Sequence, residues 1–186
     1  MAHFGDLMAP KKNSNGLTTT VEVSDLSPFS PLERILITAN GNLQRIVSSY
    51  HAKTVQIKLV YNNEIETGCF HRQVTLHLDH SETPFCRATS KVTIQNEKML
   101  RAIASNKIGI GQLFRHFDTL PVFTLLAVRR GTCDSAKNIV HGTQVLPPVN
   151  PLDLGHVGDP FWRLYRLEAA AGVDCLIHEQ FERSVL

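Results

Sequence analysis

The sequence predicts an α+β fold in which an antiparallel sheet carries helices on one face. Strand-like segments with alternating apolar residues follow one another, and helix-like segments separate only some of them. Parallel sheets need a regular alternation of strands and helices, so this order favours antiparallel pairing. The chain has 186 residues, 42% of them hydrophobic and 19% charged, and its mean hydropathy is -0.09. These values are typical of one soluble, ordered domain with a core of ordinary size.

Composition excludes several classes of protein. The formal net charge is only +2 and no basic stripe is present, so we expect no nucleic-acid partner. No apolar run approaches the roughly 18 residues that cross a membrane, and the N-terminus lacks the apolar core of a signal peptide. We therefore expect a cytoplasmic protein without membrane contact. The cysteines lack the spacing of a metal site or disulfide framework, so free thiols and no metal are expected at Cys69, Cys86, Cys133 and Cys175.

The chain begins with a polar segment, residues 1–25, that is interrupted by Pro10 and Gly16. We expect a flexible N-terminal tail there, with a short extended stretch at residues 18–23. Residues 26–186 are assigned to the folded domain.

Helix signals begin at Ser30. Ser30 and Glu33 have the spacing of a capping box, and Pro31 occupies the first helical position. Apolar residues recur at helical spacing here and in three further segments. These patterns predict a helix that begins at residue 31 and ends near Asn40-Gly41, and further helices over residues 42–49, 95–105 and 112–117.

Alternating apolar and polar residues predict most of the strands. The expected strands cover residues 54–61, 71–79, 85–94, 122–130, 161–168 and 173–181. In the first of them, Val55, Ile57, Leu59 and Tyr61 are expected to share one face. Residues 122–130 are apolar on both sides, which predicts a central strand.

The segment from residue 131 to residue 160 is rich in glycine and proline. It is too long for a plain connection between elements, so we expect either a functional loop or a disordered one. A functional loop in this position is expected to close over the site and exclude water.

Two charged residues share apolar strand faces. Successive side chains of a strand point to opposite faces, which puts Arg72 and Glu179 among apolar neighbours. A buried charge needs a partner, because an unpaired one costs several kcal/mol. The two residues could pair with each other or with Arg163 or Arg166. Alternatively both line a cavity, where Arg72 would hold a ligand carboxylate and Glu179 would accept a hydroxyl or transfer a proton.

Several short motifs lie in an order typical of one enzyme family. They are Arg34-Ile35-Leu36, Asn40-Gly41-Asn42-Leu43-Gln44-Arg45, Arg72 on a strand, Ile110-Gly111-Gln112-Leu113, Arg163 with Tyr165-Arg166, and His178-Glu179-Gln180-Phe181. Over residues 27–183 this order resembles the chorismate pyruvate-lyase family, of which the chain looks like a divergent member. Each motif is short, so the resemblance depends on their order and spacing together.

The resemblance implies a chorismate lyase-like fold, in which an antiparallel sheet and helices enclose a small buried cavity. Members of the family remove pyruvate from chorismate and leave 4-hydroxybenzoate, without a metal or an organic cofactor. Arg72 corresponds to the family's carboxylate-binding arginine, and Glu179 to its glutamate near the departing enolpyruvyl ether and the product hydroxyl. These two are the expected catalytic residues. The expected substrate-binding residues are Gly41, Asn42, Leu43, Arg87, Thr89, Gly111 and Arg166.

The chain departs from the family's pattern on the strand over residues 85–94. The well-studied lyases carry a second arginine there, where this chain has Thr89, with Arg87 two positions away. Chorismate has two carboxylates, so the absence of the second carboxylate-binding arginine favours an alternative. This alternative is a cofactor-free cyclase or pericyclase (Diels-Alderase-like) of secondary metabolism, which orients a larger apolar carboxylic acid. The threonine that often precedes the family's glutamate is His178 here, and alternation turns it away from Glu179.

A third alternative is a ligand-binding module of the related effector-sensing fold of transcription regulators. Such modules normally accompany a DNA-binding domain, and the sequence shows none. For both enzyme alternatives the partner is a small-molecule carboxylic acid, and we expect a monomer or a homodimer.

Overall fold

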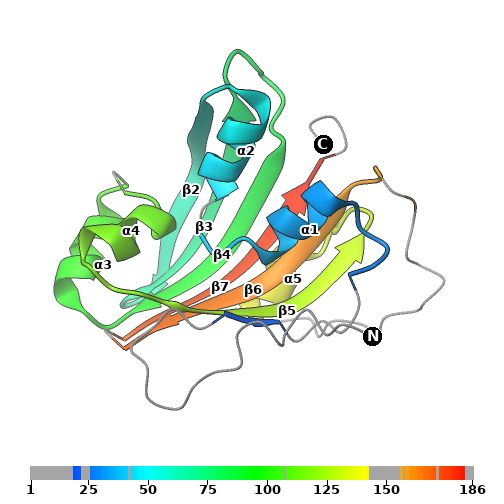
Figure 1. Cartoon of the computed structure of the whole chain (residues 1–186). Coiled ribbons are helices and arrows are strands. Elements are labelled where there is room, and N and C mark those ends of the chain that lie inside the picture. Colours follow the sequence, from blue (N-terminus) through cyan, green and yellow to red (C-terminus); the bar gives the residue numbers. More distant parts are fainter. Residues whose placement is uncertain are drawn as a thin grey trace.

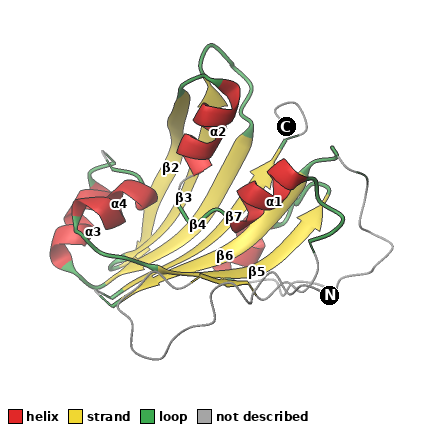
Figure 2. Cartoon of the chain, viewed as in Figure 1, coloured by secondary structure: helices red, strands yellow, loops and turns green. Residues whose placement is uncertain are grey.

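The computed structural model describes residues 19–21, 26–41, 43–106, 108–142, 156, 158–170 and 172–182. In this part of the chain a twisted sheet is combined with short helices (Figure 1 and Figure 2). The helices are α1 (Pro31–Thr38), α2 (Leu43–His51), α3 (Glu97–Ala104), α4 (Ile110–His116) and α5 (Ala136–His141). The strands are β1 (Thr19–Val21), β2 (Val55–Glu66), β3 (Cys69–Leu78), β4 (Cys86–Ile94), β5 (Val122–Arg130), β6 (Phe161–Ala169) and β7 (Val173–Phe181).

Strands β2 to β7 form an open antiparallel sheet in the order β5-β6-β7-β4-β3-β2. The short β1 extends this sheet by pairing in parallel with β5. The α+β class and the antiparallel pairing are as predicted. β1 falls within the extended stretch expected at residues 18–23, and the rest of the predicted tail lies outside the described residues.

β5 lies next to one edge of the sheet, which corrects the prediction of a central strand. Phe123 and Leu125 face the main core, whereas Leu126 and Ala127 pack against a second, smaller core on the opposite face. Both sides of β5 are therefore apolar because both faces of the sheet are covered there. A continuous apolar run predicts burial and does not predict position within the sheet.

Helices cover both faces of the sheet, but unequally. α1 to α4 lie on one face, over the main core (Figure 1). α5 packs against β4 and β7 on the opposite face, over the second core of Ile139, Val140, Trp162 and Leu164. The prediction that the helices lie on one face is thus correct for α1 to α4 and wrong for α5. α5 is a short helix inside the Gly/Pro-rich segment, where its local signal is weak.

The start of α1 confirms the predicted capping box. Glu33 N donates to Ser30 Oγ at 3.3 Å, and Ser30 N donates to Glu33 Oε2 at 2.6 Å. The same Glu33 carboxylate forms a buried ion pair with Arg130 Nη2, at 2.8 Å, which ties α1 to the end of β5. The first helix is therefore fixed relative to the sheet at its N-terminus.

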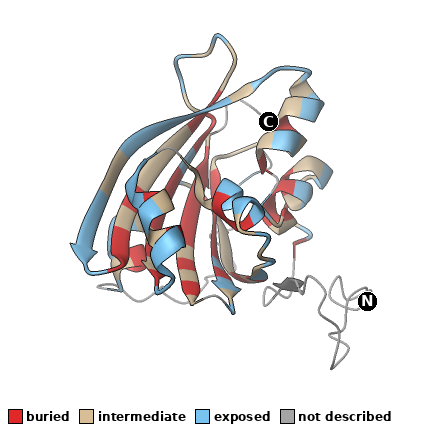
Figure 3. Ribbon diagram, turned by 90° about the vertical axis from the view of Figure 1, so that its left-hand side faces the viewer, coloured by how far each residue is buried: buried red, intermediate tan, exposed pale blue. Residues whose placement is uncertain are grey.

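β2 forms one edge of the sheet that the structure describes, and it is mostly exposed (Figure 3). A register shift between Leu59 and Tyr61, in the pairing with β3, makes Val60 an extra residue. An extra residue reverses the alternation of side chains, because strands have a period of two. Tyr61 consequently lies opposite Gln73 and under the ammonium of Lys137 from α5. This corrects the expectation that Tyr61 shares a face with Leu59.

The Gly/Pro-rich segment over residues 131–160 contains α5. This helix packs on the face opposite to α1 to α4, so the described part of the segment does not close over the cavity presented below. Residues 143–155 and 157 of the segment lie outside the described residues. None of the helices in the described chain has the length and apolar character needed to cross a membrane.

Candidate functional site

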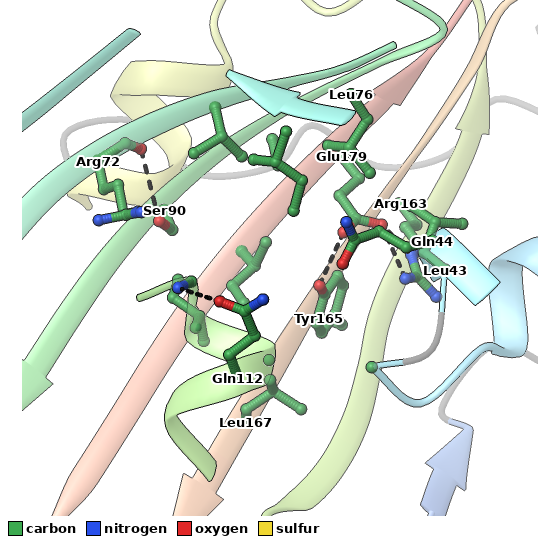
Figure 4. Close-up of a pocket in the computed structure, with 18 of the residues that line it drawn as sticks. Leu43, Gln44, Arg72, Leu76, Ser90, Gln112, Arg163, Tyr165, Leu167 and Glu179 are labelled. Atoms are coloured by element: carbon green, nitrogen blue, oxygen red, sulfur yellow. Dashed lines mark hydrogen bonds and ion pairs between the residues drawn. The ribbon is translucent and has the colours of Figure 1, made fainter. Parts of the chain in front are cut away.

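A cavity of about 200 Å³ lies between the sheet and the helices α2 and α4 (Figure 4). Its apolar wall includes Ile57, Val74, Leu76, Leu167 and Ile177. Polar side chains enter at two ends, with Arg72 at one end and Glu179, Arg163 and Tyr165 at the other (Figure 4). The cavity thus has an apolar middle between two charged ends.

The register of the sheet fixes this arrangement. One row across the strands consists of Arg72, Ser90, Ile177 and Tyr165. The next row consists of Val74, Ala88, Glu179 and Arg163. Arg72 and Glu179 are therefore two strands and one row apart, which corresponds to about 12 Å between their Cα atoms. Their side chains point into the same space from its two ends.

Arg72 is a buried arginine that lacks an acidic partner in the described chain, and 5% of its surface is exposed. Its Nη2 donates to the Ile108 carbonyl at 3.4 Å, and its buried Nη1 has no hydrogen-bond partner within the described ranges. Burial lowers the pKa of Arg72. A buried cation without a counter-charge is costly, so an anionic ligand group would be stabilised strongly here. The guanidinium fork matches a carboxylate.

Glu179 is held by two neighbours on β6. Arg163 Nε donates to Oε2 at 2.7 Å, and Arg163 Nη2 lies 2.7 Å from the same oxygen. Tyr165 Oη donates to Oε1 at 2.9 Å. Arg163 is itself fixed by the end of α1, because its Nη1 donates to the carbonyls of Ile37 and Ala39, each at 2.8 Å. Helix α1 therefore positions the arginine that positions Glu179.

The electrostatics of this cluster favour a charged Arg163 and a protonated Tyr165. Burial, and then the neighbouring Glu179 carboxylate, raise the pKa of Tyr165 well above its usual value. Burial alone would lower the pKa of Arg163, but the Glu179 carboxylate outweighs it and raises that pKa. Of the partners that the sequence left open, Glu179 pairs with Arg163. Arg72 does not share this ion pair, and both residues line the cavity.

Three further predicted site residues, Gly41, Leu43 and Gly111, also line the cavity. Gly41 has a φ of +73°, a left-handed conformation that favours glycine, in the turn from α1 to α2. A Cβ on Gly111 would lie 3.6 Å from the Gly41 carbonyl, so this turn and α4 meet at the cavity wall. Asn42, predicted beside them, lies outside the described residues.

Arg87 and Thr89 do not reach this cavity. Ala88 and Ser90 line it from β4, so alternation turns Arg87 and Thr89 to the opposite face. The prediction that Arg87 and Thr89 bind the substrate in this cavity is therefore wrong, and β4 presents only small side chains to it. The sequence carries this signal, because polar residues alternate with apolar or small ones throughout β4.

Arg166 is also outside the cavity. It follows Tyr165 on β6 and therefore points to the opposite face, where it is exposed. Its Nε and Nη2 donate to the carboxylate of Asp174, at 2.8 and 2.7 Å, and these hydrogen bonds raise its pKa. The structure thus assigns Arg166 to a surface ion pair and not to substrate binding.

Gln44, Gln112 and Arg115 line the cavity although the sequence did not predict them as site residues. Gln112 Oε1 accepts a hydrogen bond from Gly109 N at 3.1 Å, at the start of α4. Arg115 is exposed on α4 and forms no ion pair within the described residues. Polar residues on short helices ordinarily face water, so no sequence pattern distinguishes these three.

No protein-family model matches the chain, and a search of curated proteins returns no match. The resemblance to the chorismate pyruvate-lyases therefore remains a prediction. Within the described ranges, no three His, Cys, Asp or Glu side chains are grouped in a way that could hold a metal ion.

Proposed function

We propose that this protein is a cofactor-free lyase acting on a small carboxylic acid, with chorismate as the first candidate substrate. The observation that carries the proposal is Arg72, a buried guanidinium on the cavity wall with an unused Nη1 and no acidic partner in the described chain. A carboxylate bound there would supply the missing counter-charge.

The opposite end of the cavity suits the other end of such a substrate. With the ring carboxylate at Arg72, a ring across the apolar middle would direct its hydroxyl and enolpyruvyl ether toward Glu179 and Tyr165. A volume of about 200 Å³ suits a single ring with small substituents. Two polar groups separated by an apolar wall fix the orientation of the ligand, which is the main requirement of a reaction without a cofactor.

The reaction requires that the bond from the ring to the ether oxygen breaks and that the neighbouring ring carbon loses its proton. The departing oxygen takes up a proton, and the enolpyruvate becomes pyruvate. Glu179, paired with Arg163, offers a carboxylate that can accept a hydrogen bond from the ring hydroxyl or remove a proton. Tyr165 keeps its proton and holds this carboxylate in place.

The proposal is tested by incubating purified protein with chorismate and measuring pyruvate and 4-hydroxybenzoate. We expect both products in equal amounts, with and without a chelator. Glu179→Gln should slow their release by about 10²–10⁴-fold, the usual contribution of a positioned acid or base. The matched control is Asp174→Asn, a carboxylate-to-amide change on the opposite face of the sheet, which should retain activity. Wild-type protein that gives no product above the spontaneous rate would sink the proposal.

One observation favours the cyclase or pericyclase alternative. Ala88 and Ser90 face the cavity from β4, so Arg72 is the only buried arginine there without a carboxylate partner among the described residues. A substrate with one carboxylate would then match the charges of the cavity better than chorismate, which has two. This alternative predicts that apolar monocarboxylic acids bind more tightly than chorismate, and calorimetric titration compares the two. If either ligand binds but is not converted to product, the third alternative, a ligand-binding module, is favoured.

A further inference from the structure

A second cavity, of about 410 Å³, lies on the opposite face of the sheet. It is formed by β3, β4 and β7, by the start of α5 and by the chain that precedes α5. Arg87, Thr89, His178 and Gln180 all line it. These residues alternate along β4 and β7 with Ala88, Ser90, Ile177 and Glu179, which line the first cavity. The two cavities are therefore back to back on the same two strands.

His178 is the least satisfied polar side chain of this second cavity. It is 0% exposed, and neither of its buried ring nitrogens has a hydrogen-bond partner among the described residues. Burial lowers its pKa to about 4, so the imidazole is neutral at physiological pH and offers one donor and one acceptor. The Trp162 ring lies beside it, with 5.0 Å between ring centroids. Buried polar groups are nearly always paired, so the unused N–H of this ring points to a bound acceptor.

Hydrogen-bond donors gather around His178. Gln73 Nε2 donates to Thr89 Oγ1 at 3.1 Å, which leaves the Thr89 hydroxyl proton free to donate into the cavity. Arg87 and Lys137 are exposed at the cavity and form no ion pair within the described residues. The surroundings therefore offer one hydroxyl donor and two cations, of which Lys137 also lies over the Tyr61 ring.

The charges around this cavity are not all positive. Asp134 and Glu182 also line it, and neither lies within ion-pair distance of a cation in the described chain. The lining therefore carries two cations and two carboxylates, and an anion would be attracted locally, to Arg87 and Lys137.

We propose that this second cavity binds a small molecule through an oxyanion, either a carboxylate or a phosphoryl group. Arg87 and Lys137 form ion pairs with the oxyanion, and Thr89 and His178 donate hydrogen bonds to its oxygens. Because Glu179 lies between His178 and Gln180 on β7, a ligand here contacts the strand that positions Glu179. The inference does not depend on the reaction proposed for the first cavity.

The experiment is a backbone-amide NMR titration of the full chain, in phosphate-free buffer, with inorganic phosphate in one arm and malonate in the other. We expect saturable shifts centred on Thr89, His178 and Gln180. Arg87→Gln combined with Lys137→Gln should weaken binding about tenfold or more, since hydrogen bonds to charged groups are among the stronger ones. Both side chains are exposed, so this variant should fold normally.

Two controls distinguish specific binding in the second cavity from non-specific attraction of the anion to surface cations. Arg45→Gln combined with Lys98→Gln removes the same charges from exposed positions on α2 and α3 and should leave the affinity within twofold. Arg72→Lys changes only the first cavity and should also leave it unchanged. A response to only one of the two anions identifies the oxyanion. No saturable response to either anion, as for a cavity filled by water alone, overturns the proposal, as does equal weakening in the Arg45/Lys98 control.

Discussion

Two buried arginines, Arg72 and Arg163, line the first cavity and differ in their hydrogen-bond and ion-pair partners. Arg163 has a carboxylate partner in Glu179, and its Nη1 also donates to two carbonyls at the end of α1. Arg72 has one long hydrogen bond, to the Ile108 carbonyl. Arg163 is therefore a structural residue that orients Glu179, whereas Arg72 would bind the ligand carboxylate under the proposed function.

This contrast predicts opposite effects on stability. Arg163→Met leaves Glu179 buried without its cation and should lower the free energy of unfolding by about 3–5 kcal/mol, as for breaking other buried ion pairs. Arg72→Met removes a buried cation that has no counter-charge in the described part of the chain, so the unliganded protein should be equally or more stable. The same change should weaken binding of 4-hydroxybenzoate by about 2–5 kcal/mol, as for truncating a buried charge pair. Urea unfolding and calorimetric titration measure the two quantities.

Arg45→Met, on the exposed surface of α2, is the control for both measurements and should change neither. If Arg72→Met destabilises the unliganded protein as much as Arg163→Met does, then Arg72 has a structural partner and its role as a ligand anchor is lost.

The face to which a single side chain points was predictable where the alternation of side chains along a strand determines it. Alternation put Arg72 and Glu179 on the core face, and both line the cavity. For Arg87 and Thr89 the expectation followed the family pattern, although alternation along β4 turns both away. The choice of Arg163 as the partner of Glu179 depends on the pairing of β6 with β7, which no local pattern contains.

At the scale of elements, α5 is attached to the sheet partly by two stacked histidines. His71 from β3 and His141 from α5 lie with ring centroids 3.2 Å apart and planes within 11°. Burial lowers the pKa of His71, with help from His141 and Lys91. Burial also lowers the pKa of His141, with help from Lys91 and Lys137. The fold therefore favours the neutral form of both rings.

This predicts that α5 is less firmly attached in acid. Both pKa values lie below the ordinary 6.5, so below about that pH the unfolded chain binds protons that the folded chain does not. The stabilisation by the neutral pair is present above pH 6.5 and is lost as the pH falls. Urea unfolding between pH 7.5 and pH 5.5 should show a smaller loss of stability for His141→Gln than for wild type. His80→Gln, at an exposed site, should behave as wild type. Equal pH dependence in all three proteins would exclude this role of the stacked pair.

Element boundaries were predictable where the chemistry is local. The capping box gave the start of α1, and alternation gave β7 at its observed bounds. The β-bulge at Val60, which turns Tyr61 toward α5, was not predictable from the sequence. A bulge is defined by the partner strand, and the sequence around Val60 shows no break in its apolar character.

At the scale of the whole molecule, the sheet separates two chemically different spaces. The face covered by α1 to α4 carries the mostly apolar cavity with Arg72 and Glu179, and the face covered by α5 carries the polar cavity with His178. The antiparallel class was predictable because alternation signals are local. The second covered face was not, because the six-residue α5 has too few residues to show a periodic signal.

This separation predicts where each ligand protects the backbone from hydrogen exchange. 4-Hydroxybenzoate, in phosphate-free buffer, should slow exchange in α4, because Gly111 and Gln112 line the first cavity and the helix has only seven residues to hold it in place. Exchange in α5 should not change, since α5 packs on the other face. Arg72→Met should abolish the protection of α4.

Protection of residues 143–155 in addition would support the predicted closing segment, whereas unchanged exchange throughout 131–160 would exclude it. Protection of α5 without α4 would place the carboxylic acid on the wrong face of the sheet for Arg72 and Glu179 and would remove the basis of the proposed lyase function.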